Sequence, residues 1–291
     1  MQARIQPYFH DDTNTWTYLV SCPTNARAVI IDPVLDYDAP SGRIATHAAD
    51  ALIAVVREQG MTLDWILETH AHADHLSAAK YLQAELGGEI GIGRGITEVQ
   101  ATFKTVFDLE PGFATDGSQF DRLIDEGDEL AFGECRLRAM ATPGHTSDSM
   151  TYLVDDAAFI GDTLFMPDGG TARCDFPGGD AGLLYDSIQK LFALPPETRI
   201  FVNHDYGPDG RAFQNQTTVA EEREDNIMIG GGISREDFID KRRARDAGLS
   251  APKLLYPAVQ INIRAGARPP KASNGSSYLK IPLRYPGWDG G

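Results

Sequence analysis

The stretch Thr69-His70-Ala71-His72-Ala73-Asp74-His75 places four potential metal ligands within six residues. Imidazole and carboxylate groups suit zinc, iron, manganese or nickel, and the absence of cysteine from the set argues against a closed structural zinc site. The alternative is a hydrogen-bonded core His70 and an Asp74 that only caps a helix. That alternative would bury several imidazoles without a partner, at a cost in stability. The cluster therefore predicts a metal site.

The segments on either side of the cluster predict how it is held. Residues 63–69 form an apolar run typical of a buried strand, and residues 74–86 have helical spacing closed by Gly87-Gly88. In an extended segment, residues two apart point to the same side. His70 and His72 are therefore expected to face one point, while Asp74 and His75 turn away as the helix begins.

Further metal-ligand candidates follow the ends of other predicted strands. Alternation and short apolar runs predict strands at 15–21, 28–33, 129–141, 150–154, 157–161 and 199–203, and helical spacing predicts helices at 46–59 and 180–193. The candidates at or after such strand ends are His145, Asp162 and His204. Side chains at strand ends are where sheet folds usually carry chemistry.

Composition narrows the class of protein. The 291 residues are 42% hydrophobic and carry a formal charge of −16, from 26 Lys and Arg against 42 Asp and Glu. Such a charge repels the phosphate backbone on which non-specific nucleic-acid binding depends. It also repels small anions at long range, so an anionic substrate must be collected by Arg or Lys near the site.

The cysteines and the ends of the chain bear on its compartment. Cys22, Cys135 and Cys174 are odd in number and widely spaced, unlike a disulfide framework or a CxxC motif. No apolar run approaches the roughly 20 residues of a membrane span, and the first residues lack the apolar core of a signal peptide. We expect a cytoplasmic protein without membrane or nucleic-acid partners.

The sequence changes character after about residue 213. Residues 221–225 and 235–245 are charged and helix-prone, and 265–291 is rich in Pro, Gly and Ser with one apolar run at 278–283. We therefore predict a catalytic domain over 1–213. Residues 214–291 are predicted to form a helical and extended appendage that packs on the domain or on a partner subunit, with the apolar run covered.

Four motifs together resemble the metallo-β-lactamase superfamily over residues 15–206: the cluster at 69–75, Thr142-Pro143-Gly144-His145-Thr146, Gly161-Asp162 and Asn203-His204-Asp205-Tyr206. The resemblance implies an α/β fold, a four-layer αβ/βα sandwich with the site at one edge of two packed sheets. In two-metal members, the positions matching His70, His72 and His145 hold one ion. Those matching Asp74, His75 and His204 hold the other, and that of Asp162 bridges.

A narrower resemblance is to the persulfide dioxygenases, also called sulfur dioxygenases, a branch of sulfur metabolism and sulfide detoxification. It is carried by Ala172-Arg173-Cys174-Asp175-Phe176, Leu184-Tyr185-Asp186-Ser187 and His204-Asp205-Tyr206, and residues 260–266 extend it to a bacterial subgroup with a longer C-terminus. It implies one Fe(II) per chain held by His70, His145 and Asp162, with His72, Asp74, His75 and His204 around it. The implied reaction oxidises glutathione persulfide with O2 and water to sulfite and glutathione. Leu76 and the length of 166–172 depart from the pattern and bear on the pocket's shape.

Three neighbouring residues are candidates for substrate contacts. Arg173 is predicted to bind a glutathione carboxylate, and an ion pair with Asp175 is the alternative. Thr146 is predicted either to bind substrate or to orient His145. Tyr206 is predicted to donate its phenol proton, with a backbone cap as the alternative. Cys174 lacks an identifiable basic partner and is expected only to pack.

Two other functions remain open from the sequence. All seven possible ligands are present, which also suits a two-zinc hydrolase of a glutathione thioester or a lactone. A non-catalytic interaction protein on the same fold is the third alternative, although it gives the complete ligand set no purpose. We also expect a homo-oligomer, a dimer.

Overall fold

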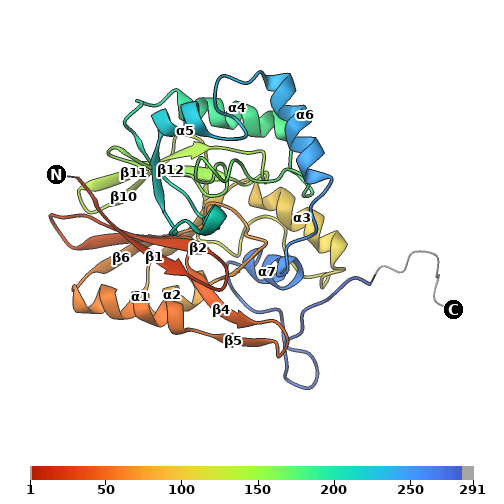
Figure 1. Ribbon diagram of the computed structural model, residues 1–291. Helices are drawn as coiled ribbons and strands as arrows, with labels where there is room; N and C mark the ends of the chain where they lie inside the picture. Colours follow the sequence, from red (N-terminus) through yellow and green to blue (C-terminus); the bar gives the residue numbers. More distant parts are fainter. Residues whose placement is uncertain (1, 284–291) are drawn as a thin grey trace.

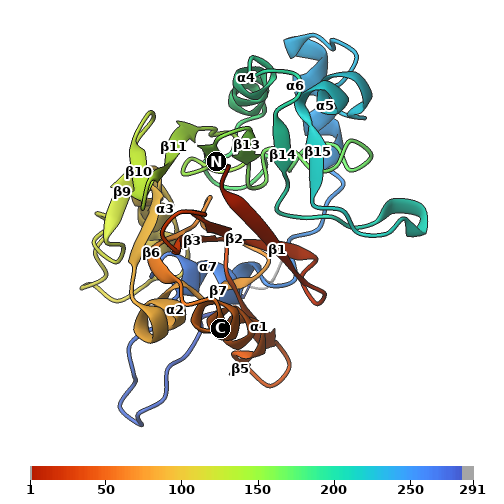
Figure 2. The ribbon, with the colours of Figure 1, turned by 90° about the vertical axis from the view of Figure 1, so that its left-hand side faces the viewer.

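Two six-stranded sheets lie face to face at the centre of the molecule (Figure 1, Figure 2). The computed structural model describes residues 2–283. The strand order of the first sheet is β1 (Arg4–His10), β2 (Thr15–Ser21), β3 (Arg27–Ile31), β6 (Thr62–Leu67), β8 (Glu89–Gly93) and β9 (Arg122–Ile124). The order of the second is β10 (Glu129–Phe132), β11 (Cys135–Ala141), β12 (Met150–Val154), β13 (Ala157–Phe159), β14 (Arg199–Phe201) and β15 (Gln216–Thr218).

Helices cover the outer face of each sheet, which makes four layers. On the side of the first sheet lie α1 (His47–Glu58), α2 (Ala79–Leu86), α3 (Ile96–Val106) and α7 (Leu255–Asn262). On the side of the second lie α4 (Ala181–Phe192), α5 (Val219–Asp225) and α6 (Arg235–Asp246). A small sheet, β5 (Arg43–Ala45), β4 (Val34–Asp38) and β7 (Leu76–Ser77), joins the first layer, and η1 (Pro208–Gly210) is a single 3-10 turn. The predicted αβ/βα sandwich is confirmed.

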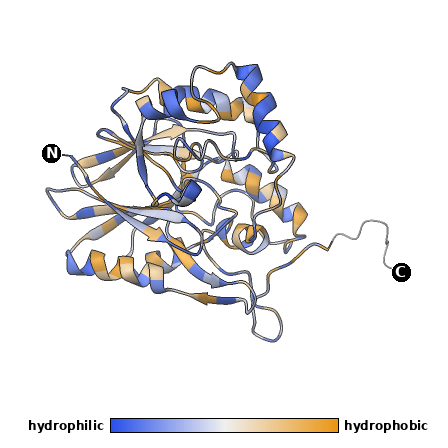
Figure 3. Ribbon diagram, viewed as in Figure 1, coloured by the Kyte–Doolittle hydropathy of each residue, from blue (hydrophilic) through white to orange (hydrophobic). Residues whose placement is uncertain are grey.

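Alternation along the central strands divides the core in two. Leu19 and Ile30 pack toward the helices, whereas Val20, Val29 and Ile31 pack between the sheets. Both faces of these strands are therefore apolar, as expected for strands buried on two sides. In contrast, α6 is mostly hydrophilic (Figure 3) and buries only a stripe with i, i+4 spacing, Phe238, Arg242 and Asp246.

The predicted strands at 15–21, 28–33 and 63–69 and the helices at 46–59 and 180–193 are confirmed within a few residues. Asp180 accepts the backbone N–H of Leu183 at 2.8 Å and begins α4 as an N-cap. The helix predicted from Asp74 is wrong at its start: α2 begins at Ala79, because Leu76 and Ser77 pair instead with β4. β1, α3 and α7 were not predicted.

The C-terminal part is not a separate layer. β15 pairs with β14, and α7 contributes Ala258, Val259 and Ile261 to the core under the first sheet. The domain boundary at 213/214 stays a prediction. Of the apolar run at 278–283, Leu279 packs against this core but Tyr278, Ile281 and Leu283 are exposed, unlike the predicted covered run. The expected extended tail lies partly outside the described residues, at 284–291.

No helix within residues 2–283 combines the length and apolar composition that a bilayer crossing requires.

Candidate metal centre

The loop between β6 and β7 carries the histidine cluster and has no regular backbone pattern of its own. Side chains from distant elements hold it in place. Asp32, which follows β3, accepts the N–H of Thr69 at 2.7 Å, and Asp148, which precedes β12, accepts the N–H of Ala71 at 2.8 Å. Buried N–H groups that lack a ladder partner need such acceptors.

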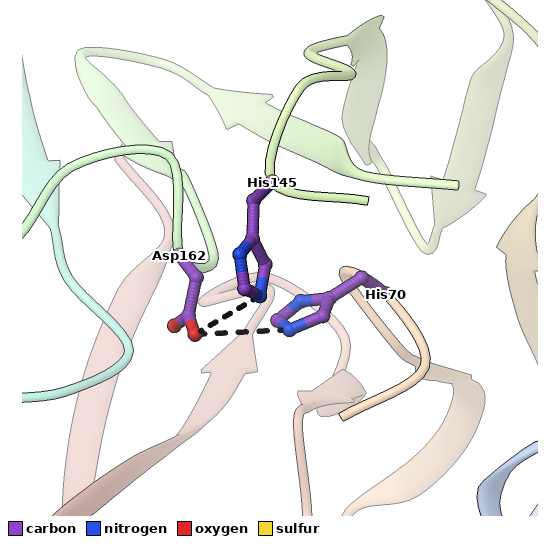
Figure 4. Close-up of side chains that lie close together, drawn as sticks. All are labelled: His70, His145 and Asp162. Carbon is purple, nitrogen blue, oxygen red and sulfur yellow. Dashed lines mark ion pairs between the residues drawn. The ribbon is translucent and has the colours of Figure 1, made fainter. Parts of the chain in front are cut away.

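His70, His145 and Asp162 bring their ligand atoms together at one point (Figure 4). Nε2 of His70 lies 3.8 Å and Nε2 of His145 lies 3.6 Å from Oδ2 of Asp162. Nε2 of His70 and Oδ1 of Asp162 are buried without a hydrogen-bond partner among the described residues. Unpartnered buried polar atoms that converge in this way fit a bound cation.

The far nitrogen of each histidine fixes which nitrogen faces the site. Nδ1–H of His145 donates to the carbonyl oxygen of Arg173 at 2.7 Å. Nδ1–H of His70 donates to Oγ1 of Thr69 at 3.0 Å, because that hydroxyl already gives its own hydrogen to Asp32. Both rings therefore present an Nε2 lone pair, the form that a metal requires.

A second group of ligands lies beside the first and shares Asp162. Oδ2 of Asp74 lies 3.3 Å from Nδ1 of His75 and 3.2 Å from Nε2 of His204, and Oδ1 of Asp162 lies 3.5 Å from the same His204 nitrogen. Burial lowers the pKa of His204, but the charges of Asp74 and Asp162 outweigh burial and raise it. The region between the carboxylates of Asp74 and Asp162 therefore stabilises a positive charge, such as that of a metal ion.

His72 is oriented differently from the sequence prediction. Its Nε2 lies 3.0 Å from Oδ1 of Asp32 and 3.3 Å from Oε2 of Glu68. Burial opposes its positive charge, yet these two carboxylates raise its pKa well above the ordinary value. The strand alternation on which the prediction rested does not hold because the loop bends at this point. His72 remains close to Asp74 and His75 in the second group.

A cavity of about 360 Å³ opens onto both groups of ligands. Asp74, His145, Asp162 and His204 form its polar part. The rest of the wall combines aromatic rings with three arginines: Phe165, Phe176, Tyr206, Arg173, Arg242 and Arg245. An apolar wall with a few convergent polar groups is typical of a small-molecule site.

Two of these arginines are already paired. Arg173 donates from Nε and Nη2 to Asp175 at 2.6 and 2.7 Å, so the alternative ion pair is present. Arg242 donates to Asp246 on the same helix at 2.6 and 3.0 Å. Arg245 is exposed, and within residues 2–283 its guanidinium makes neither a hydrogen bond nor an ion pair. The unpaired arginine of the cavity wall, among the described residues, thus lies on α6, from which no site residue was predicted.

Tyr206 and Thr146 differ in their access to the cavity. Tyr206 lines it, is 57% exposed, and stacks on His204 with ring centroids 6.0 Å apart. Thr146 is buried, and its hydroxyl bonds that of Ser149 at 2.7 Å. It does not orient His145, whose Nδ1 is held by Arg173, and its contact with substrate stays a prediction.

The family model for the metallo-beta-lactamase superfamily matches residues 10–204. The chain belongs to this superfamily. A probable metallo-hydrolase of Burkholderia pseudomallei is 53% identical over 96% of this chain and 98% of its own length. The mitochondrial persulfide dioxygenase ETHE1 of Homo sapiens is 31% identical over 92% of this chain and 91% of its own.

A solved structure of a related protein is also similar to this chain. ETHE1 from Myxococcus xanthus has a TM-score of 0.73 and 32% identity, covering 91% of this chain and 100% of that one. These likenesses are consistent with the persulfide dioxygenase branch that the motifs resemble.

Sequence reasoning missed the residues that support the ligands of this superfamily member. They are Asp32, Glu68, Asp148 and Asn262. It also missed Arg245 on the cavity wall. Asp32 gave a usable signal, a carboxylate directly after a buried apolar strand. The others lie within strands, loops or helices whose polar residues look ordinary until the fold brings them to the loop.

Proposed function

We propose that this chain is a persulfide dioxygenase that oxidises glutathione persulfide with O2 and water to sulfite and glutathione at one Fe(II). The proposal is carried by the grouping of His70, His145 and Asp162, in which two imidazoles and one carboxylate converge without cysteine. Two histidines and one carboxylate on one face are typical of non-haem Fe(II) oxygenases. The likeness to the ETHE1 proteins supports the same branch.

The proposed reaction balances without a further reductant. The S–S bond of the persulfide breaks, the inner sulfur leaves as the thiol of glutathione, and the outer sulfur becomes sulfite. The persulfide loses four electrons in all, O2 accepts them, and two protons are released. Water supplies the third oxygen atom. His70, His145 and Asp162 would hold the iron, which would supply the redox chemistry between sulfur and oxygen.

The residues of the chain would hold and orient the substrate. Glutathione carries two carboxylates, and Arg173 and Arg245 place two guanidinium groups on one cavity. Arg245 has the free hydrogen-bonding face, whereas Asp175 competes for that of Arg173. Tyr206 would donate a hydrogen bond from its phenol to the bound persulfide, since its hydroxyl makes no hydrogen bond within residues 2–283. Burial and the charges of Asp162 and Asp74 raise its pKa, which keeps the phenol protonated. The rings of Phe165 and Phe176 would give the substrate an apolar wall.

A two-zinc hydrolase is the second candidate, and a specific observation favours it. Asp162 lies between His145 and His204, so the second group of ligands can complete a dinuclear site. The Burkholderia relative is also named a metallo-hydrolase. Its substrate here would be a glutathione thioester or a lactone.

Metal content and oxygen uptake separate the two candidates. Protein purified without oxygen should carry close to one iron per chain, and Asp162→Ala should lose it. With glutathione persulfide, the iron form should consume O2 and release sulfite in equal amounts. Two tightly bound zinc ions, rapid thioester or lactone hydrolysis and no oxygen uptake would overturn the dioxygenase proposal.

Three further expectations go with this function. We propose that residues 1–213 form the domain that carries every metal ligand, with residues 214–291 packed on it, that the protein works in the cytoplasm, and that it forms a dimer. Light scattering of the metal-loaded protein tests the dimer directly, and a monomer at micromolar concentration would contradict it.

A further inference from the structure

We propose that Asn262 is a positioning residue that holds the ligand-bearing loop in its metal-binding shape. It lies at the C-terminal end of α7 and is 4% exposed. Its Nδ2 donates to the carbonyl oxygens of His72 and His75, each at 2.8 Å, and its Oδ1 accepts the N–H of Ser77 at 2.8 Å. Because the two carbonyl oxygens need a donor and the N–H needs an acceptor, the side-chain amide can take only the orientation with Nδ2 toward the carbonyls and Oδ1 toward Ser77.

These bonds fix the backbone on both sides of Asp74. The carbonyls of His72 and His75 bracket residues 73 and 74, and both histidines are fully buried, so water cannot replace a lost donor. Asp74 lines the cavity, and its carboxylate meets His75 and His204. Asn262 therefore decides where the ligands of the second group point.

The same amide reaches His72 by a second route. Ser77, whose N–H it accepts, donates its hydroxyl to Glu68, and the other oxygen of Glu68 lies 3.3 Å from Nε2 of His72. A shift at Ser77 would move the carboxylate that holds this ring. Residues of this kind do not bind the metal themselves, but their hydrogen bonds orient the side chains that do.

The end of α7 is anchored well enough to serve as a brace. Ile261 and Ile263 are buried in the core, and the side-chain amide of Gln100 donates to the carbonyl of Ile263 at 2.9 Å. Gly266 has a φ of +84°, and a Cβ there would lie 2.8 Å from the carbonyl oxygen of Ser77. The chain thus passes directly against the loop, and only glycine permits this approach.

Gln260, on the same helix, offers a matched control. It is 1% exposed, and its amide bonds both the N–H and the carbonyl of Lys280 at 2.9 Å, with a further bond to the carbonyl of Tyr256. It therefore attaches the C-terminal segment to α7 and makes no contact with the metal ligands. Removing either amide breaks several buried hydrogen bonds and should lower the stability of the protein. Only Asn262, however, contacts the loop that carries the metal ligands.

The experiment compares Asn262→Ala, Asn262→Asp and Gln260→Ala in the full-length chain. Fe²⁺ without oxygen and, separately, Zn²⁺ are titrated against a competing chelator, and unfolding is followed in urea without metal. Both Asn262 variants should bind metal about 10- to 100-fold more weakly. Asn262→Asp has the same size but presents an oxygen to the two carbonyls. Gln260→Ala should lose stability while its metal affinity stays within about twofold.

A measurement on the unsubstituted chain completes the test if a variant fails to fold. In the metal-free protein, hydrogen exchange at the Ser77 N–H should be slow, because the brace does not depend on metal. Free exchange there, or full metal affinity in either Asn262 variant, would overturn the proposal. The outcome does not depend on the reaction, because the same loop would serve an iron oxygenase or a zinc hydrolase.

Discussion

In a metal-binding histidine, the hydrogen bond made by the nitrogen that faces away from the site decides whether the other nitrogen can bind the metal. In His145 that nitrogen is tied to the backbone of Arg173, a residue first considered only for its side chain. A substitution of Arg173 keeps this carbonyl, so it tests the guanidinium alone. We expect Arg173→Ala to retain its metal, so any change in its kinetics would come from the lost positive charge at the cavity wall.

Arg245 should be the stronger determinant of substrate affinity. Arg245→Ala should raise KM for glutathione persulfide about tenfold with little change in kcat, because a charge contact made equally in ground and transition state is lost. Initial rates of oxygen uptake measure this. Arg243→Ala is the control, because Arg243 is exposed on the same helix but does not line the cavity. Equal KM values for the two variants would remove Arg245 from the site.

Tyr206 should act on the chemical step rather than on binding. Tyr206→Phe keeps the ring that stacks on His204 but removes the hydroxyl, so kcat should fall about 100-fold while KM changes little. Tyr185→Phe provides the comparison, because that hydroxyl bonds the carbonyl of Ile233 away from the cavity. A Tyr206→Phe enzyme with unchanged kcat would leave this residue a packing role only.

The ligands themselves could be predicted from sequence, but their supports could not. Strand ends can be predicted from a single sequence, and the ligands His70, His145 and Asp162 follow such ends. Asn262 is a polar residue in an apolar segment, and nothing near it in sequence says that it meets His75, 187 positions away. Contacts of that separation depend on how layers pack, which local patterns do not encode.

At the scale of elements, α6 connects the surface to the metal ligands. Its buried pair supports the loop after Thr171: Arg242 donates to the carbonyl of Thr171 at 2.9 Å, and Asp246 accepts the N–H of Cys174 at 2.9 Å. That loop carries the carbonyl that orients His145. Charged, helix-prone composition predicted α6, whereas the start of α2 was misplaced because the pattern at 74–78 cannot reveal that β4 pairs with Leu76 and Ser77.

α5 contains a group that should make stability depend on pH. Glu222 is fully buried, and burial raises its pKa from 4.5 to about 8. The folded state therefore holds a proton that the unfolded state releases above pH 4.5. The free energy of unfolding should fall as pH rises from about 4.5 to about 8, by at most about 1.4 kcal/mol per pH unit from this residue.

Glu222→Gln should remove that part of the slope, because glutamine stays neutral throughout. Urea unfolding at pH 5.5, 7 and 8.5 compares the two proteins, and the variant should gain most, relative to the original chain, at pH 8.5. The carboxylate of Glu224, exposed on the same helix, gives a control in Glu224→Gln. Parallel slopes for the Glu222 variant and the original chain would show that Glu222 does not titrate in this range.

At the scale of the whole molecule, the last helix belongs to the first sheet. A chain that ends at Ala267 keeps α7, whereas one that ends at Pro252 loses its buried residues Ala258, Val259 and Ile261. The longer truncation product should therefore fold and bind metal. The shorter one should be less soluble and should not bind metal, since it lacks both the core residues and Asn262.

Circular dichroism, light scattering and metal titration on both truncated proteins test this prediction. Equal behaviour of the two would mean that α7 is dispensable. The apolar run at 278–283 was expected to be the covered part of the tail, but three of its large apolar side chains are exposed, and the buried contacts lie earlier, in α7.

The brace between α7 and the metal loop also orders events during synthesis. His72 leaves the ribosome 190 residues before Asn262, which is about 10 to 40 seconds earlier at ordinary rates of translation. Throughout that interval the first sheet can form, but its ligand loop lacks the donor for two buried carbonyls. A nascent chain stalled before α7 should therefore not retain metal, and loading with the metal becomes one of the last steps in the maturation of the protein.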